Sequence, residues 1–214
     1  KEAEPAARSI AARQGFKGVR WMKMTDPSGM EAPSNVGSFL IWQQPHPIYL
    51  AELLYRVGRD RKVIDSYYPI VEETARFMAD FVTKDKEGRY ELRGLIPAQE
   101  TLRAAETVNP PFELSYWHFG LSTAQKWRER KGLDRVKEWD DIIAGLSPLA
   151  AADSLYLAAE TAPETYSDIR LTSDHMAVLA ALGVLPGNPL IDKNIMSRTA
   201  DWVFKNWNWN KTWG

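Results

Sequence analysis

Apolar residues recur at helical spacing in seven stretches of this chain, and Gly-, Pro- and Asn-containing connectors separate these stretches. The pattern predicts helices over residues 3–14, 47–58, 61–83, 112–130, 134–146, 174–183 and 189–207. Tight turns such as residues 58–60 join several of them. The sequence therefore predicts an all-α fold built from antiparallel helical hairpins.

Evidence for strands is thin and limited to short segments. Residues 85–92 are expected to form a small hairpin with its turn at 86–88, and a short strand is expected near 155–157. Gly15 is the expected C-cap of the first helix. Pro69, inside the helical pattern of residues 61–83, is expected either to kink that helix or to mark its true start.

Three long connectors carry most of the polar and aromatic residues outside the helices: residues 15–46, 84–111 and 147–172. Irregular segments of this length are uncommon in compact domains and are usually functional. In an array of hairpins, alternate connectors fall at the same end. We therefore expect these three connectors to gather over one pocket, with long polar and aromatic loops at one end of the helices.

Composition narrows the class of protein. The chain has 214 residues, with 27 basic and 28 acidic side chains that are well interleaved, so nucleic-acid binding is not expected. No apolar run reaches the roughly 18–20 residues of a membrane helix, and no membrane partner is expected. Cysteine is absent, which excludes disulfides and thiolate chemistry. No pattern fixes the compartment; a periplasmic or extracellular location is favoured over a cytoplasmic one.

The first connector contains a strong type I turn at residues 26–29, Asp-Pro-Ser-Gly. This turn would bring the arm that carries Trp21 and Lys23 to face the arm that carries Glu31. An aromatic plate beside a cation and a carboxylate suits a sugar, because a pyranose offers apolar faces for stacking and hydroxyls for hydrogen bonds. The alternative interpretation is an exposed, salt-bridged turn.

The same connector ends with Trp42, Gln43, Gln44 and His46. Two amides beside an aromatic are costly to bury without partners, and they suit a ligand rich in hydroxyls. His46 lies at the start of a predicted helix. The three histidines of the chain show no metal-ligand spacing, so neither a metal nor a cofactor is expected.

In the second connector, Glu100 lies in a loop between apolar segments. A general acid in glycoside cleavage is a carboxylic acid held in partly apolar surroundings, where it can protonate the leaving oxygen. The alternative is an ordinary loop glutamate. Asn109 is expected to cap the helix that follows. Further along, Thr172 or Ser173 is expected to cap the next helix with Asp174 favouring its dipole, unless this segment contributes to the pocket.

Together these motifs resemble glycoside hydrolase family 65 and its six-hairpin relatives. Residues 18–21, Gly-Val-Arg-Trp, then Gly-Met-Glu at 29–31 and a helix led by His46 are similar to the family's active-site segment. Arg20 stands where the family has Pro. Residues 97–100, Pro-Ala-Gln-Glu, followed by Asn109, are similar to the family's Gly-Pro-Asp-Glu run and the Asn after it.

This resemblance implies an (α/α)6 barrel and a glycoside hydrolase that acts on oligo- or polysaccharides. It implies an inverting mechanism with Glu100 as general acid and a second carboxylate that activates water, whereas phosphorolytic relatives use phosphate. Residues 1–214 would then be a single partial barrel, truncated at both ends, with the second carboxylate beyond Gly214. The Trp-rich run 207–214 would begin another pocket loop.

Two other interpretations remain open from the sequence. The chain could be a non-catalytic α-helical module that binds carbohydrate or acts as a scaffold, using the aromatic and amide residues but giving Glu100 no chemistry. It could also be a helical-repeat interaction domain whose aromatics line a groove for a protein partner.

Overall fold

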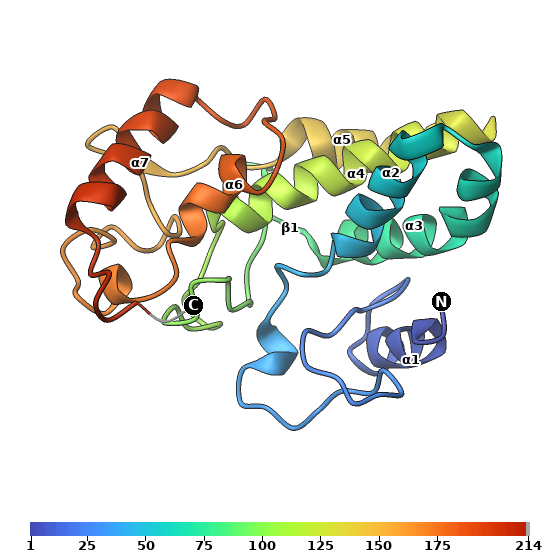
Figure 1. Ribbon diagram of the computed structural model, residues 1–214, viewed down its shortest axis with the longest axis horizontal. Helices are drawn as coiled ribbons and strands as arrows, with labels where there is room; N and C mark the ends of the chain where they lie inside the picture. Colours follow the sequence, from blue (N-terminus) through green and yellow to red (C-terminus); the bar gives the residue numbers. More distant parts are fainter. Residues whose placement is uncertain (213–214) are drawn as a thin grey trace. The chain divides into compact units, whose positions relative to one another are not determined.

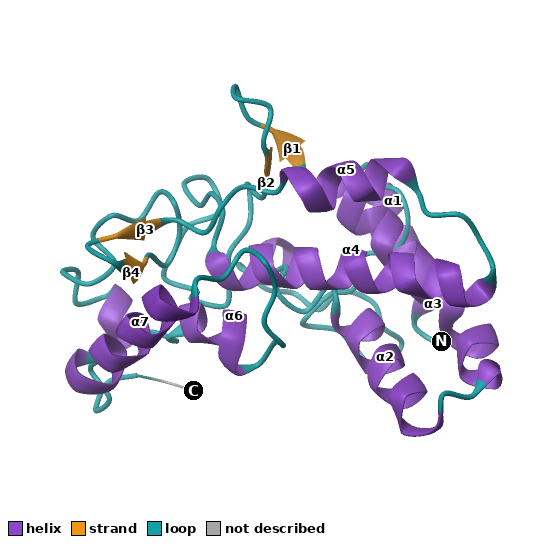
Figure 2. Ribbon diagram, turned by 90° about the horizontal axis from the view of Figure 1, so that it is seen from above, coloured by secondary structure: helices purple, strands orange, loops and turns teal. Residues whose placement is uncertain are grey.

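A computed structural model describes residues 1–212, which form seven α-helices, three 3-10 turns and two small two-stranded sheets (Figures 1 and 2). The helices are α1 (Glu4–Arg13), α2 (His46–Gly58), α3 (Arg61–Phe81), α4 (Pro111–Lys131), α5 (Lys137–Gly145), α6 (Ala180–Gly183) and α7 (Lys193–Asn206). The 3-10 turns are η1 (Gly37–Phe39), η2 (Leu171–Ser173) and η3 (Ala177–Leu179). The strands are β1 (Thr83–Lys84), β2 (Tyr90–Glu91), β3 (Ala151–Ala152) and β4 (Leu155–Tyr156). The predicted all-α fold class is confirmed.

Six of the seven predicted helices have a counterpart within a few residues of the expected bounds. The prediction over residues 174–183 is wrong in its first half, where an irregular segment and η3 precede the short α6. The reason lies at Asp174, whose backbone is extended, with φ −106° and ψ −171°. Its carboxylate accepts hydrogen bonds from other backbone groups and does not cap a helix. The last two residues of the Trp-rich run, 213–214, lie outside the described residues.

The chain divides into two compact units. The first unit consists of residues 1–38, 43–82 and 117–145. The second unit consists of residues 39–42, 83–116 and 146–214. Helix α4 belongs to the second unit up to Tyr116 and to the first unit from Trp117. The expectation of one partial barrel domain over 1–214 stays a prediction.

In the first unit, α2 and α3 pack against each other as a helical hairpin. Arg59 joins them in the left-handed conformation, and the Asp60 side chain accepts the Lys62 amide at 2.8 Å as N-cap of α3. Helix α3 begins well before Pro69, which lies inside the helix and does not mark its start. Large aromatics fill the interior of this unit, and the indole of Trp117 donates to the Met78 carbonyl at 2.9 Å.

The second unit contains both sheets. Strand β1 pairs antiparallel with β2, and β3 with β4, so the predicted hairpin at residues 85–92 and the strand near 155–157 are confirmed. In Figure 2 the β3–β4 pair lies beside α7. The link is a hydrogen bond from the Tyr156 amide to the Thr199 hydroxyl of α7, at 3.0 Å. A polar side chain of helix α7 thus accepts a backbone amide of the short strand β4.

Gly18 in the first unit is held where no other residue fits, and this generates a test. Its φ is +72°, and an added Cβ would lie 2.2 Å from the Glu73 carbonyl oxygen and 2.6 Å from the Phe77 nitrogen of α3. Gly15 has a similar φ of +82° with open space around it. Replacing Gly15 by Ala should cost about 1 kcal/mol of unfolding free energy, the cost of the left-handed conformation alone. Replacing Gly18 by Ala should cost about 3 kcal/mol or more, because α3 has to move as well.

Chemical denaturation of the two variants measures this difference, with Gly15→Ala as the matched control. Equal losses for the two substitutions would show that the Gly18 segment does not pack on α3 as described.

Candidate functional site

The predicted site residues are distributed over both units. Trp21, Lys23, Glu31, Gln43, Gln44 and His46 belong to the first unit, whereas Trp42 and Glu100 belong to the second. Each group is described within its own unit. The convergence of all eight residues on one pocket therefore stays a prediction.

In the first unit, the two adjacent amides bind the backbone of the preceding segment. The Gln44 side chain accepts the Trp21 amide at 2.8 Å and donates to the Val19 carbonyl at 2.7 Å. The Gln43 side chain donates to the Trp21 carbonyl at 2.9 Å. Gln44 is completely buried. These bonds hold residues 19–21 beside the start of α2, which gives both amides a structural role; a role in sugar binding stays a prediction.

Trp21 is held at both its backbone and its ring. Its indole N–H donates to the Thr74 hydroxyl of α3 at 2.8 Å, while the side chain as a whole stays partly exposed. An indole fixed by its nitrogen and open on part of its surface can act as a stacking plate. His46 begins α2, and burial lowers the pKa of its imidazole, so this ring is neutral at neutral pH.

The turn at residues 26–29 is confirmed, because the Gly29 amide donates to the Asp26 carbonyl at 3.0 Å. The two arms face each other through a bridge between Thr25 and Glu31. The Glu31 carboxylate forms an ion pair with Arg13 and accepts the Ser38 hydroxyl at 2.5 Å, and it is therefore engaged within this unit. These contacts agree with the alternative interpretation of this segment as a salt-bridged turn. Lys23, on the facing arm, is exposed.

In the second unit, the loop that carries Glu100 is held on both sides of this residue. The Ala98 amide donates to Glu113 of α4 at 2.7 Å. The Thr101 amide donates to Asp174 at 2.7 Å. Between them, the Gln99 side chain donates to the carbonyl of Leu171 at 3.0 Å. Glu100 itself is half-buried. The backbone around the candidate general acid is therefore bound to distant parts of the chain.

Glu113 is the most buried carboxyl group in this arrangement, with no exposed surface. Its Oε1 accepts the Ala98 amide, and among residues 1–212 its Oε2 lies buried without a hydrogen-bond partner. Burial raises the pKa of Glu113 from its ordinary 4.5 to about 7, and the bond from Ala98 opposes this shift only in part. Near neutral pH this side chain is therefore divided between the acid and the carboxylate.

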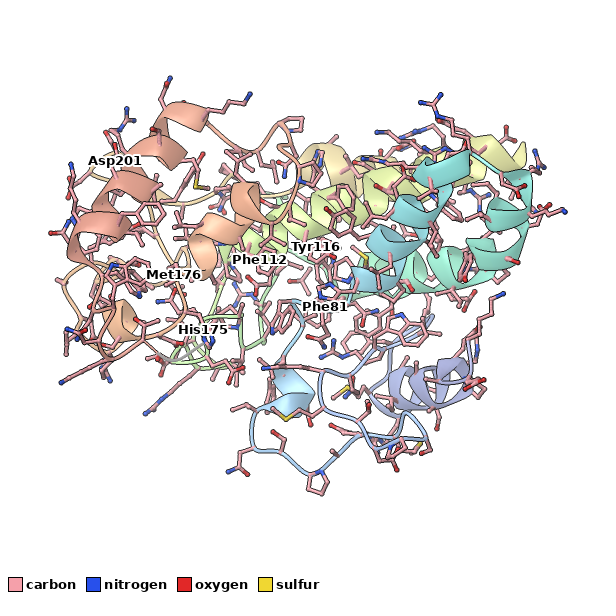
Figure 3. All side chains as sticks on the ribbon, viewed as in Figure 1. Phe81, Phe112, Tyr116, His175, Met176 and Asp201 are labelled. Carbon is pink, nitrogen blue, oxygen red and sulfur yellow. The ribbon has the colours of Figure 1, made fainter. Side chains whose placement is uncertain are left out.

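Asp174 is 2% exposed and binds three groups. Besides the Thr101 amide, it accepts the His175 amide at 2.6 Å, and its Oδ1 lies 2.9 Å from Nδ1 of the His175 ring. Figure 3 labels His175 beside Met176, just before α6. One carboxylate thus holds both the Glu100 loop and a partly exposed imidazole. The expected capping of the next helix by Thr172 or Ser173 is wrong, because no side chain caps η3 or α6.

Asn109 also differs from its expected role as a helix cap. It is completely buried with φ +52°, and helix α4 begins two residues later at Pro111. Its Oδ1 accepts the Leu92 amide at 2.9 Å, and its Nδ2 donates to Glu160 at 2.7 Å. Asn109 therefore fastens the β2 segment and the third connector to each other. Asparagine is one of the few residues that tolerate this conformation.

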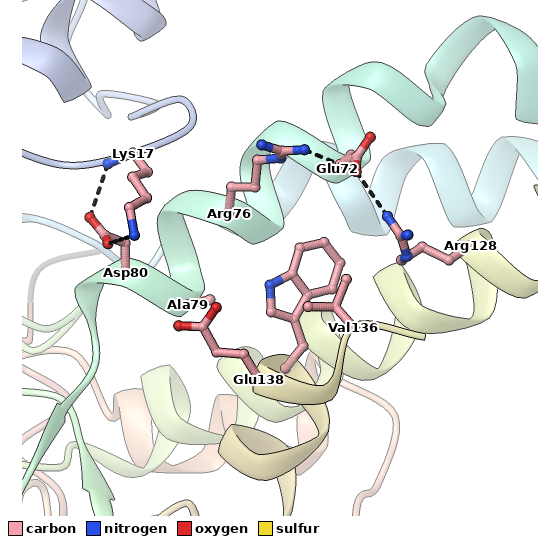
Figure 4. Close-up of a pocket in the computed structure, with 9 residues that line it drawn as sticks. Lys17, Glu72, Arg76, Ala79, Asp80, Arg128, Val136 and Glu138 are labelled. Carbon is pink, nitrogen blue, oxygen red and sulfur yellow. Dashed lines mark hydrogen bonds and ion pairs between the residues drawn. The ribbon is translucent and has the colours of Figure 1, made fainter. Parts of the chain in front are cut away.

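A pocket of about 330 Å3 in the first unit is separate from the predicted site (Figure 4). Its lining residues are Lys17, Glu72, Arg76, Ala79, Asp80, Arg128, Val136, Glu138 and Trp139. Several of its charges neutralise one another: Glu72 lies 3.3 Å from Arg76 and 2.9 Å from Arg128, and Lys17 lies 3.2 Å from Asp80. Paired surface charges of this kind are typical of a solvated face.

Two further findings concern membranes and metals within the described part of the chain. None of the helices there combines the length and the apolar character needed to cross a membrane. No group of three or more His, Asp or Glu side chains within residues 1–212 is arranged to hold a metal ion.

Sequence reasoning missed Glu113 and the true role of Asp174. The signal for Glu113 is a single acid inside the apolar run Pro-Pro-Phe-Glu-Leu-Ser-Tyr-Trp at residues 110–117. A lone carboxyl in such a run is costly unless it has a partner. Figure 3 shows Phe112 and Tyr116 in this part of α4, where their rings stack 5.7 Å apart.

Comparisons with known proteins support the fold. No protein-family model matches the sequence, and no curated protein matches it. Among solved structures, the fold is similar to that of a chain described as "Putative kojibiose phosphorylase from human microbiome", with a TM-score of 0.63 at 12% sequence identity. The match covers 74% of this chain and 26% of that one, so this chain corresponds to about a quarter of its length. The likeness supports a distant family 65-like fold; a complete (α/α)6 toroid stays a prediction.

The buried carboxyl of Glu113 predicts an unusual dependence of stability on pH. Its folded-state pKa, about 7, lies above its ordinary value of 4.5, so the unfolded chain loses this proton first as the pH rises. The stability that the protonated group provides is complete below about pH 4.5 and is lost as the pH approaches about 7. Glu113→Gln removes this ionisation. Relative to the variant, the wild type should lose on the order of 3 kcal/mol of unfolding free energy between about pH 4 and pH 8.

Denaturant unfolding of both proteins across this pH range measures the difference, with the exposed Glu106→Gln as control. A constant difference between wild type and Glu113→Gln at all pH values would contradict the buried, raised-pKa state of this carboxyl.

Proposed function

We propose that the protein to which this chain belongs cleaves glycosidic bonds, with Glu100 as the general acid. The observation that carries the proposal is the placement of Glu100: a half-buried carboxyl group in a loop whose neighbouring residues, 98, 99 and 101, are all fastened by hydrogen bonds. A general acid has to reach the leaving oxygen within hydrogen-bond distance, which demands a fixed loop. The fold likeness to a chain described as a carbohydrate phosphorylase supports the same class of reaction.

In this proposal Glu100 enters the reaction protonated and gives its proton to the oxygen of the leaving sugar as the glycosidic bond breaks. Hydrolysis with inversion also needs a second carboxylate, about 6.5–9.5 Å from the first, to activate water on the opposite face. The partly exposed indole of Trp21 is the proposed stacking surface for a pyranose ring.

Phosphorolysis is the second candidate, and the name of the structural neighbour favours it. In that reaction the same proton transfer from Glu100 accompanies attack by inorganic phosphate at the anomeric carbon, and no protein base is needed. The two reactions differ in their products: hydrolysis releases a free sugar, whereas phosphorolysis releases a sugar 1-phosphate.

The role of Glu100 is tested by replacing it with Gln in the intact protein. Loss of general acid catalysis should lower kcat by about 10²–10⁴-fold on natural oligosaccharides, because their leaving groups need the proton. Glu106→Gln, an exposed acid six residues along the same loop, is the matched control and should keep wild-type turnover. Undiminished turnover by Glu100→Gln would reject the assignment. Binding of sugars without turnover in the wild type would favour the non-catalytic carbohydrate-binding module.

The choice between water and phosphate is tested by product analysis. Kojibiose and a panel of other disaccharides and oligosaccharides are incubated with the intact protein, with and without inorganic phosphate. Hydrolysis predicts turnover in both conditions and free sugars only. A strict requirement for phosphate, with a sugar 1-phosphate as product, would replace hydrolysis by phosphorolysis and leave the role of Glu100 intact.

A further inference from the structure

The Glu100 loop is fastened by two buried carboxyl groups, which accept backbone amides on opposite sides of Glu100. Glu113 holds the amide two residues before Glu100, and Asp174 holds the amide directly after it. Both bonds measure 2.7 Å, at the short end of the range for a backbone amide donor. Because these two amides bracket Glu100, fixing them restricts the backbone dihedrals that aim its side chain.

Two further contacts complete this arrangement. The Gln99 side chain, 1% exposed, donates to the Leu171 carbonyl. Leu102 packs against the buried cluster of Ala158, Ala159, Ala162 and Leu171. The loop is therefore held by hydrogen bonds at its centre and by apolar packing at its C-terminal side.

The choice of an acid at position 113 is costly. The side chain is fully buried, and Oε2 contributes no hydrogen bond among the described residues. A neutral acceptor could satisfy the Ala98 amide without the cost of burying an ionisable group. What Glu113 does supply is the acceptor for the Ala98 amide, which ties helix α4 to the loop of the proposed general acid.

From this geometry we infer that Glu113 and Asp174 are positioning residues that hold the Glu100 loop in the conformation needed for proton transfer. The inference rests on the proposed function of Glu100. Neither carboxyl group is assigned a contact with substrate. Their loss should therefore lower kcat while leaving KM nearly unchanged.

The test uses two substitutions at position 113 in the intact protein. Glu113→Gln keeps an oxygen that can accept the Ala98 amide, whereas Glu113→Leu fills the site with no acceptor. We expect Glu113→Leu to lower kcat about 10²-fold, because a general acid displaced by about 1 Å loses this much. Glu113→Gln should retain kcat within about threefold, and KM should change little in both. Glu91→Gln removes another buried carboxylate of the same unit, one that does not bind residues 98–101, and serves as control.

Amide hydrogen exchange at Ala98 and Thr101 gives a readout that is independent of turnover. We expect Glu113→Leu to speed exchange at Ala98 by about tenfold or more, while Glu113→Gln keeps the protection. Asp174→Ala provides the same test at Thr101 and serves alone if Glu113→Leu does not fold. If Asp174→Ala does not fold either, an Ala98 amide unprotected in the wild type overturns the inference and a protected one supports it.

The outcomes separate this inference from the proposed function. If Glu100→Gln loses turnover but Glu113→Leu keeps both kcat and slow exchange at Ala98, the positioning role is wrong and the general acid stands. If Glu113→Gln lowers kcat as much as Glu113→Leu does, while the Ala98 amide stays protected from exchange, the acceptor role of Glu113 is overturned. If Glu100→Gln keeps full turnover, the proposed function fails, and the inference about proton transfer fails with it.

Discussion

Long connectors in this protein depend on buried side chains to satisfy their backbone hydrogen-bonding groups. A buried amide without an acceptor costs free energy comparable to a lost hydrogen bond, and these segments have almost no sheet partners to supply one. The side chain of Gln44 accepts a hydrogen bond from the Trp21 amide, that of Glu113 from the Ala98 amide and that of Asn109 from the Leu92 amide. The conformation of the first two connectors therefore depends on particular side chains, of which Glu113 lies outside them and Gln44 and Asn109 lie near their C-terminal ends.

The same constraint changes how polar residues in these loops are interpreted. Amides and carboxylates beside aromatics are the groups that a sugar needs, and they are also the groups that a loop backbone needs. Burial helps to distinguish a structural role from ligand binding. Gln44 is completely buried, and both its polar side-chain atoms bind backbone groups. Glu100 is half-buried, and Trp21 donates its indole N–H to Thr74 while the residue as a whole stays partly exposed. The last two remain the stronger candidates for contact with a ligand.

Local signals in the sequence predicted most of the helices, the turn at residues 26–29 and the small hairpin. Helix α3 follows from an apolar period near 3.6, and the hairpin of β1 and β2 follows from its Gly-containing turn. The position of the Glu100 loop was also predictable. Its anchors were not, because the partners of Ala98 and Thr101 are 15 and 73 residues away. The cap prediction at Asn109 failed because Asn is a common helix cap, whereas here its side chain binds the Leu92 amide and Glu160 instead.

The two carboxyl groups that hold the Glu100 loop affect how rigid this loop is. Each anchor accepts a backbone amide of the loop through a buried side chain, so each one narrows the range of conformations that the loop can adopt. Asp174 adds a second effect, because it binds the His175 ring and the Thr101 amide at once. Any shift of that carboxylate would move both groups. The entropic cost of ordering the loop therefore falls on folding and not on substrate binding. Burying two acids lowers the free energy of unfolding in return. A loss of stability for the sake of a fixed loop is expected where the position of one side chain decides a reaction rate, and under the proposed function that side chain is Glu100.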